Sequence, residues 1–343
     1  MKKIKTVEAV GQVLIHDITQ IIKGERTGVL FKKGHVVRKC DIEALLSVGK
    51  DHIYIYEADE GSLHENDAAT ILMEICTHRK KTFLATEVRE GKIEILATCN
   101  GLLKVDVQRL AAVNALGEMI IASRHNNSIV AKGDKVAGTR IIPLAIRGEK
   151  MQKARDLAKN QPVLDFKPFH NFKVGVITTG NEIFYNRIAD TFTPVIEKKL
   201  EVYGLTIDKH AIVADDVSQI VKQIKSFQAK GIQMILCTGG MSVDPDDVTP
   251  AAIKASGAKL LTYGVPVLPG SMLLIGYLDE EIPIIGLPGC VMYAETTGFD
   301  LIFPRILAKD KITKEEIAQL GHGGLCLKCK TCIFPHCGFG KGW

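Results

Sequence analysis

The stretch that decides the fold is Ile232-Gln-Met-Ile-Leu-Cys-Thr-Gly-Gly-Met-Ser-Val-Asp-Pro-Asp-Asp-Val-Thr-Pro250. Its first part, residues 232–237, is almost continuously apolar, which is typical of a strand buried on both faces of a parallel sheet. The glycine turn Thr238-Gly-Gly240 follows directly. Thr249-Pro250 then predicts the start of a helix, because proline is favoured at the first helical position. Strand, glycine turn and helix in this order are characteristic of α/β proteins.

The same alternation continues on both sides of this stretch. Before it, we expect strands at 173–179 and 205–213, with a helix from Thr193-Pro194 to Gly204 between them. Next comes an amphipathic helix, whose apolar side chains recur at helical spacing: Val217, Ile220, Val221, Ile224 and Phe227. After the stretch, strands are expected at 271–278 and 281–286, and a helix from about residue 291. This spacing predicts a three-layer, doubly wound, mostly parallel α/β domain over residues 168–310.

The first half of the chain predicts a mixed α+β region over residues 1–165. Asp41 can cap a helix at 42–48, a strand follows at 52–56, and residues 82–97 are typical of a hairpin. Further elements are expected as a helix at 106–117, strands at 119–123 and 140–146, and a polar helix at 149–160. Two prolines within residues 161–170 predict a linker, and residues 311–343 stand apart as a cysteine-rich tail.

Composition narrows the classes of function. The 343 residues are 46% hydrophobic and 24% charged, which are ordinary values for a globular protein, and the formal net charge is +5. Lysines and arginines are scattered without interleaved aromatic residues, so no nucleic-acid surface is expected. No apolar run approaches the roughly 20 residues that cross a bilayer, and no secretory signal is present. We therefore expect a cytoplasmic protein without a membrane partner.

Three of the expected strand ends are rich in glycine: Thr178-Thr-Gly-Asn-Glu182, Thr238-Gly-Gly240 and Gly286-Leu-Pro-Gly289. In open α/β sheets, ligands bind outside the carboxyl ends of the strands, where loops from several strands converge. Glycine lets backbone N–H groups approach such a ligand closely, although tight strand-to-helix turns need glycine in any case.

Carboxylates accompany these glycines. They are Asp190, Asp215, Asp216, Asp244, Asp246 and Asp247. Six carboxylates on one rim repel each other unless a cation or polar ligand groups compensate. Mg²⁺ is the natural bridge between carboxylates and a phosphorylated ligand, because it prefers oxygen ligands. The alternative is that some of them only cap helices, and Asp216 suits that role best.

The motifs carry a family resemblance. Five motifs in order resemble the successive signatures of the molybdenum-cofactor biosynthesis domain: Thr179-Gly-Asn-Glu-Ile183, Val213-Ala-Asp-Asp-Val217, Thr238-Gly-Gly-Met-Ser-Val243 with Asp247-Val-Thr-Pro250, Pro269-Gly270, and Gly286-Leu-Pro-Gly289. That domain occurs in molybdopterin adenylyltransferases, in molybdotransferases including the gephyrin group, and in the competence-induced pyrophosphatases. Residues 8–57, with Gly24 and Asp41 among them, resemble the segment that precedes the domain in molybdotransferases.

The resemblance implies molybdopterin as the ligand and a transferase related to the molybdotransferases. It places Asp216 and Asp247 near a Mg²⁺ ion and the phosphate, and Asp190 at the helix opposite. It also implies a homo-oligomer that serves a molybdoenzyme, with molybdate or a nucleotide as a second ligand. The residues expected to bind the cofactor are Thr179, Gly180, Asn181, Glu182, Thr238, Gly239, Gly240, Ser242, Asp244, Pro269, Gly270, Gly286, Pro288 and Gly289.

The sequence departs from the family pattern at several positions, so the resemblance does not decide between possible activities. Leu268 precedes the Pro269-Gly270 turn and Ser271 follows it, where molybdotransferases usually carry lysines. Cys290 replaces an expected asparagine, and an asparagine usual shortly after Asp190 is absent. Only about 35 residues follow the domain, so no C-terminal β domain is expected. Molybdate insertion therefore stands beside two alternatives, a non-catalytic molybdopterin carrier or sensor and a nucleotide pyrophosphatase.

The tail concentrates four of the nine cysteines. Cys326, Cys329, Cys332 and Cys337 form a C-x₂-C-x₂-C-x₄-C pattern, which is typical of Zn²⁺ ribbons and of [4Fe–4S] loops. Spacing does not separate the two, and the alternative is a disordered tail with reactive thiols. The other five cysteines are expected to be small buried hydrophobes.

Overall fold

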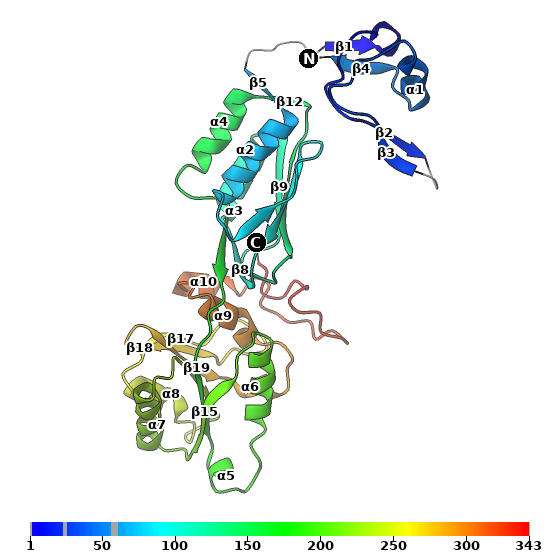
Figure 1. Cartoon of the computed structure of the whole chain (residues 1–343). Helices are drawn as coiled ribbons and strands as arrows, with labels where there is room; N and C mark the ends of the chain where they lie inside the picture. Colours follow the sequence, from blue (N-terminus) through cyan, green and yellow to red (C-terminus); the bar gives the residue numbers. More distant parts are fainter. Residues whose placement is uncertain (1, 23–25, 56–60, 343) are drawn as a thin grey trace. The chain divides into compact units, whose positions relative to one another are not determined.

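The computed structural model describes residues 2–22, 26–55 and 61–342. Gly24 and the end of the strand expected at 52–56 lie outside these residues. The chain forms two compact units. The first comprises residues 1–99, 104–124 and 130–166, and the second comprises residues 100–103, 125–129 and 167–343. Each unit is described separately below (Figure 1).

The first unit begins with a small α+β subdomain. Strand β1 (Lys2–Lys5) pairs antiparallel with β4 (His52–Ile55), and β2 (Ile18–Ile22) pairs with β3 (Arg26–Phe31). The short helices are η1 (Thr6–Glu8) and α1 (Asp41–Ser47). Its core is formed by Ala9, Leu14, Ile18, Val37, Leu45 and Ile53.

The rest of the first unit is an antiparallel sheet with helices. The sheet has the order β6 (Phe83–Ala85), β7 (Lys92–Ala97), β11 (Lys135–Ile141) and β9 (Met119–Ser123), and helix α2 (Glu65–Thr77) contacts it through β7 and β11. Strand β5 (Ser62–His64) pairs with β12 (Ala145–Arg147), and α3 (Val107–Ala115) contacts α4 (Gly148–Leu157). Strands β8 (Gly101–Val105), β10 (Ser128–Val130) and β13 (Leu164–Pro168) contain residues of both units.

One strand expected in the first half of the chain was misplaced, and the expected linker, which contains the boundary between the two units after Phe166, also contains a strand. The strand expected at 140–146 begins earlier, as β11, and ends at Ile141. The expected linker at 161–170 contains β13, an edge strand in which Leu164 and Phe166 are buried. Its prolines fit this position, because Pro168 lies at the end of the strand and edge strands tolerate proline.

The second unit is built on a six-stranded sheet of order β15-β14-β16-β19-β18-β17. Its strands are β14 (Val174–Thr179), β15 (Ile207–Val213), β16 (Met234–Thr238), β17 (Lys259–Tyr263), β18 (Leu274–Leu278) and β19 (Ile282–Leu287). The first four in spatial order are parallel, and β18 and β17 add an antiparallel edge. The mostly parallel sheet was predicted, whereas β17 was missed.

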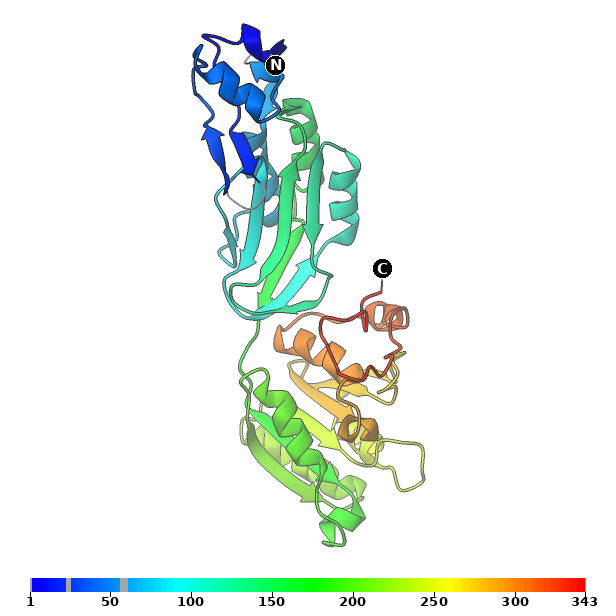
Figure 2. The same ribbon diagram turned by 90° about the vertical axis from the view of Figure 1, so that its right-hand side faces the viewer.

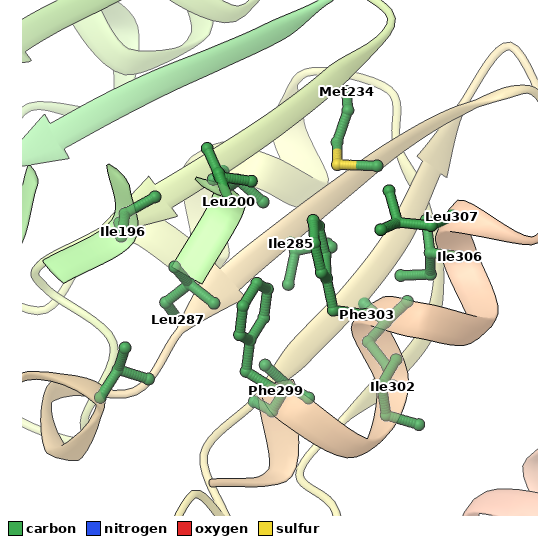
Figure 3. Packing of buried hydrophobic residues seen from close by; sticks show 14 of the residues in the cluster. Ile196, Leu200, Met234, Ile285, Leu287, Phe299, Ile302, Phe303, Ile306 and Leu307 are labelled. Carbon is green, nitrogen blue, oxygen red and sulfur yellow. The ribbon is translucent and has the colours of Figure 1, made fainter. Parts of the chain in front are cut away.

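Helices cover both faces of this sheet, so the three-layer prediction is confirmed. On one face, α6 (Phe192–Glu201) and α9 (Gly298–Leu307) pack against β14, β16 and β19, as Figure 3 shows for Leu200, Ile285 and Phe303. On the other face lie α7 (Val217–Ala229) and α8 (Thr249–Ala255). Strands β14 and β16 are buried along their whole length, as a central strand between two helical layers must be.

Two helix starts differ from the expectation. Thr193 does not cap α6, because the Asp190 carboxylate accepts the N–H groups of Phe192 and Thr193 instead. The helix expected from about residue 291 is a short 3-10 turn, η2 (Gly289–Met292), and α9 begins only after Thr297, which forms a capping box with Asp300. In both cases a side chain that satisfies the first N–H groups fixes the start.

The cysteine-rich tail belongs to the second unit, where Figure 2 shows it beside the helices that precede it. Helix α10 (Lys314–Gln319) carries the buried Ile317, and Phe339 is buried in the same core as α9. The tail is therefore packed rather than detached. None of the helices in the described ranges is long and apolar enough to cross a membrane.

Phe303 offers a test of this core. Its side chain is fully buried, with ring centroids 4.7 Å from Phe299 and 5.3 Å from Tyr203. Phe303→Ala should lower the free energy of unfolding by about 3–5 kcal/mol, since it removes the contacts and leaves a cavity. Urea unfolding followed by far-UV circular dichroism measures the change. The control Val202→Ala, at a side chain 77% exposed, should change stability by less than about 0.5 kcal/mol. A comparable small loss for Phe303→Ala would contradict this packing.

Candidate functional site

The predicted motifs meet at the carboxyl edge of the six-stranded sheet. Thr178 at the end of β14 is in register with Thr238 at the end of β16, and Thr238 is in register with Leu287 at the end of β19. On the other side, Thr179 is aligned with Val213, which ends β15. The loops after these four strands therefore leave the same edge, where ligands bind in open α/β sheets.

Two glycines allow the loops after β14 and β16 to touch. Gly239 has a φ of +84°, and a Cβ there would lie 2.1 Å from the carbonyl oxygen of Thr179. A Cβ on Gly240 would lie 2.9 Å from Thr249 Oγ1. The buried hydroxyl groups of Thr179 and Thr249 are 2.9 Å apart. These contacts explain both glycines by packing, and they fix the start of α8 against the end of β14.

Asp215 is the carboxylate that faces this junction. Its Oδ2 accepts a hydrogen bond from the N–H of Asn181 (2.8 Å), while its Oδ1 is buried without a hydrogen-bond partner among the described residues. Burial raises the pKa of the Asp215 carboxyl despite that bond, and the nearby charges of Glu182, Asp247 and Asp246 raise it further. Four acidic side chains thus act on one another here, and one of them has a free buried oxygen.

The loop after β16 supplies the outer acids of this cluster. Asp247 Oδ2 accepts the N–H of Asp244 at 3.3 Å, which closes the loop on itself. Burial and the Asp247 charge raise the pKa of Tyr263, whose hydroxyl donates to the carbonyl oxygen of Met241 (3.1 Å). Ser242 and Asp244 are exposed to solvent.

Asp216 and Asp190 are engaged elsewhere. Asp216 is the N-cap of α7 and accepts from the Ser218 hydroxyl (2.6 Å) and the Gln219 N–H (2.8 Å); these bonds hold the pKa of its carboxyl below the ordinary value. Asp190 lies on the α6 face of the sheet, where it accepts from the hydroxyl of Thr178 (3.2 Å).

Burial raises the pKa of the Asp190 carboxyl, but hydrogen bonds from Thr193, Phe192 and Thr178 outweigh it and hold the pKa below its ordinary value. His210 completes this group, with Nε2 3.4 Å from Asp190 Oδ2 and 3.0 Å from Thr178 Oγ1. Asp190 therefore lies on the α6 face of the sheet, apart from the other acids of the rim. Glu182, Asp246 and Asp247 lie near Asp215.

Sequence reasoning named Asp215 among the rim acids but did not select it as a site residue. A signal was available in the Asp215-Asp216 pair. The second aspartate directly precedes a helix and serves as its cap, so the first is the one left to face the sheet edge.

The remaining glycine turns lie at or near the same edge. Gly270 is buried, and a Cβ there would lie 2.5 Å from the N–H nitrogen of Gly298, so this turn packs directly on the start of α9. Gly286 faces Met241, and Pro288 is buried beside it in sequence. Gly289 is exposed, with open space where a side chain would be.

Within the described residues, the four tail cysteines are not arranged around a single metal position. Cys326 and Cys337 are half-buried, and Cys329 and Cys332 are exposed. Within residues 2–22, 26–55 and 61–342, no group of three histidine, cysteine or acidic side chains is placed to hold a single metal ion. Of the other cysteines, Cys76 and Cys237 are buried as expected, but Cys40 is exposed, because it precedes α1 at the surface.

Comparisons with known proteins match both halves of the chain. Residues 175–308 match the model of a family described as a probable molybdopterin binding domain, and residues 3–57 match a domain of unknown function. The molybdopterin molybdenumtransferase of Synechococcus elongatus is 24% identical over 176 residues, which are 48% of this chain and 44% of that protein. A CinA-like protein of Desulfosudis oleivorans is 34% identical over 86 residues, 25% of this chain and 21% of that protein.

These relatives are larger, and the chain spans less than half of their length. Among solved structures, the molybdopterin biosynthesis enzyme MoaB of Thermus thermophilus is 22% identical, with 39% of this chain and 91% of that chain covered and a TM-score of 0.32. The tungsten cofactor synthesizing protein MoaB of Pyrococcus furiosus is 21% identical, with 40% and 92% covered and a TM-score of 0.33. The resemblance of residues 8–57 to molybdotransferases stays a prediction.

Asp215 predicts a stability that depends on pH. Its raised pKa means that the folded chain binds this proton more tightly than the unfolded chain, so stability falls as the pH rises through the carboxyl range. Asp215→Asn removes the charge and should raise the free energy of unfolding at pH 7 in the absence of divalent ions.

The difference should shrink as the pH falls through the carboxyl range, because the wild-type carboxyl then becomes protonated as well. Chemical unfolding at several pH values measures it. The matched control is Glu201→Gln, an exposed carboxylate at the end of α6, which should have no comparable effect. Equal stability of Asp215→Asn and wild type at pH 7 would show that the acids near Asp215 do not repel it.

Proposed function

We propose that the chain binds molybdopterin at the carboxyl edge of its six-stranded sheet, because residues 175–308 match the family described as a probable molybdopterin binding domain. The ligand would lie over the loops that follow β14, β15, β16 and β19. The chain would thus take part in the biosynthesis or handling of the molybdenum cofactor. The observation that supports this placement is the buried carboxylate oxygen of Asp215, which has no hydrogen-bond partner among the described residues.

The surroundings of the Asp215 carboxylate are suited to binding a cation. Its Oδ1 is buried without a hydrogen-bond partner, and its neighbours Glu182, Asp246 and Asp247 add negative charge. Thr238, at the end of β16, likewise has a buried hydroxyl without a partner in the structure. Unpaired buried oxygens are rare in folded proteins, because each costs free energy that a bound ion or ligand would recover. Hard cations such as Mg²⁺ prefer such oxygen ligands.

In this proposal, Asp215 and Asp247 hold Mg²⁺, which offsets the phosphate charge of the bound pterin. The exposed polar groups of Glu182, Ser242 and Asp244 are available to the rest of the ligand. Asp216 contributes by capping α7 and Asp190 by capping α6, so both act as positioning residues for the loops.

Two activities are compared: insertion of molybdate into molybdopterin, and binding of molybdopterin without a reaction. The Pro269 turn lacks the flanking lysines of the molybdotransferase pattern, and the backbone of Leu268 is bonded to the tail instead: its N–H donates to Gly324 (2.8 Å), and its carbonyl accepts from Cys326 (2.8 Å). A turn occupied in this way has less room for a second anion such as molybdate. This favours a carrier or sensor of molybdopterin for a molybdoenzyme over insertion of molybdate.

Purification from a host with an active molybdopterin pathway tests the proposal. The full chain is isolated without oxygen, its ligand is released and oxidised, and fluorescence and mass identify any pterin. We expect about one molybdopterin per chain, and none from a pathway-deficient host. A bound dinucleotide, together with hydrolysis of nucleotides by the purified chain, would favour the pyrophosphatase alternative. Absence of any pterin at saturating molybdopterin would overturn the proposal.

Asp247→Asn tests the role of the acidic loop. The substitution removes a charge at nearly constant volume, so the chain should fold while the affinity for molybdopterin in Mg²⁺ falls roughly tenfold, or about 1.4 kcal/mol. Anaerobic calorimetric titration measures the affinity with Mg²⁺ and with a chelator. The loss should disappear in the chelator, and Glu201→Gln should bind like the wild type. An Asp247→Asn affinity equal to that of the wild type in Mg²⁺ would remove this residue from the site.

A further inference from the structure

A cavity in the second unit brings five cysteines together. It has a volume of about 630 Å³ and is lined by residues of the tail, by Pro269 and Cys290, and by residues 293–296. All four tail cysteines, Cys326, Cys329, Cys332 and Cys337, contribute to its wall, and so does Cys290. This cavity is separate from the acidic cluster around Asp215, whose side chains do not line it.

The tail is held around this cavity by specific contacts. Leu325 forms a parallel bridge with Leu268, and the N–H of Gly340 donates to the carbonyl of Gly323 (2.9 Å), which closes the tail into a loop. The ring of Phe334 contacts that of Phe339 edge-on at 6.3 Å, and Phe339 is buried in the core. These contacts hold the four tail cysteines around one space.

Four thiols that line one space can ligate a single ion or a larger centre. A single Zn²⁺ ion needs four ligand atoms within about 2.3 Å of one point. No three metal-binding side chains in the described part of the chain are gathered in that way, yet the four tail thiols line one common space. In a [4Fe–4S] centre each thiolate binds a different iron at the corner of a larger core, so its four ligands stand apart around a shared volume.

The rest of the wall fits the same ligand. Much of it is apolar, with Leu325, Ile333, Phe334 and Phe339. Lys328 also lines the cavity and supplies a positive charge beside a centre that four thiolates make negative. The hydroxyl of Thr296 lies 3.3 Å from Cys332 Sγ, within reach of a hydrogen bond to a ligating sulfur.

We propose that this cavity binds one [4Fe–4S] cluster through Cys326, Cys329, Cys332 and Cys337. Cys290 is a wall residue and not a ligand, because it lies outside the C-x₂-C-x₂-C-x₄-C loop. The cluster stands beside the Pro269 turn and the loop that follows β19, next to the proposed molybdopterin edge. Its binding does not require the pterin.

Anaerobic reconstitution of the full chain tests the proposal. The metal-free protein is incubated with ferrous iron and sulfide, desalted, and analysed for iron, acid-labile sulfide and visible absorption, with electron paramagnetic resonance after reduction. We expect about four irons and four sulfides per chain. A colourless protein that takes up one Zn²⁺ in competition and excludes iron would overturn the cluster. Four freely titrating thiols after reconstitution would overturn any metal centre.

Variants separate ligands from bystanders. Cys329→Ser should lose at least about three quarters of the iron, and because this side chain is exposed the fold should survive, as circular dichroism can verify. Cys40→Ser, at an equally exposed thiol of the first unit, and Cys290→Ser should keep the full iron content. Loss of iron in Cys290→Ser with retention in Cys329→Ser would overturn the ligand assignment. Protein from a pathway-deficient host should give the same iron content, so failure here is distinct from failure of pterin binding.

Discussion

The close approach of two loops holds the candidate site together. Gly239 lies against the carbonyl of Thr179, and the hydroxyls of Thr179 and Thr249 meet beneath it. Without a side chain at position 239, the loop after β16 can reach the end of β14, and the start of α8 is set by that contact. The acidic loop between them has fixed ends for this reason. Any side chain at Gly239 would force the two loops apart and move Asp247 with them.

The buried strands and the amphipathic helices could be predicted from the sequence, because their patterns depend only on local composition. Strand β16 is continuously apolar, and α7 carries one apolar stripe. The start of α6 was misplaced because Pro194 suggested a beginning at Thr193, while Asp190 supplies the actual cap. Strand β13 was missed within the expected linker because Pro162 and Pro168 outweighed the alternation of Leu164 and Phe166. Both errors arise from contacts between residues, which a pattern along one segment does not contain.

The acidic rim shows the same limit. Its carboxylates were visible in the sequence, but their division was not, since neighbouring residues on a strand point to opposite faces. Thr178 therefore joins Asp190 and His210 on one face, while Thr179 joins Thr249 on the other. Asp215 carries a charge that burial and neighbouring acids disfavour. Sites that bind ions commonly keep such unfavourable arrangements, because the bound ion repays them.

The backbone bonds between Leu268 and the tail join two regions that are far apart in the sequence. Leu268 precedes the Pro269 turn, and Cys326 lies at the start of the cysteine loop. A ligand that orders the loop and a ligand that contacts the turn would therefore each act on the same pair of hydrogen bonds. Thermodynamic linkage makes such coupling reciprocal: whatever one ligand adds to the affinity of the other, it receives in return. The two backbone hydrogen bonds of Leu268 thus connect the tail physically to the sheet edge.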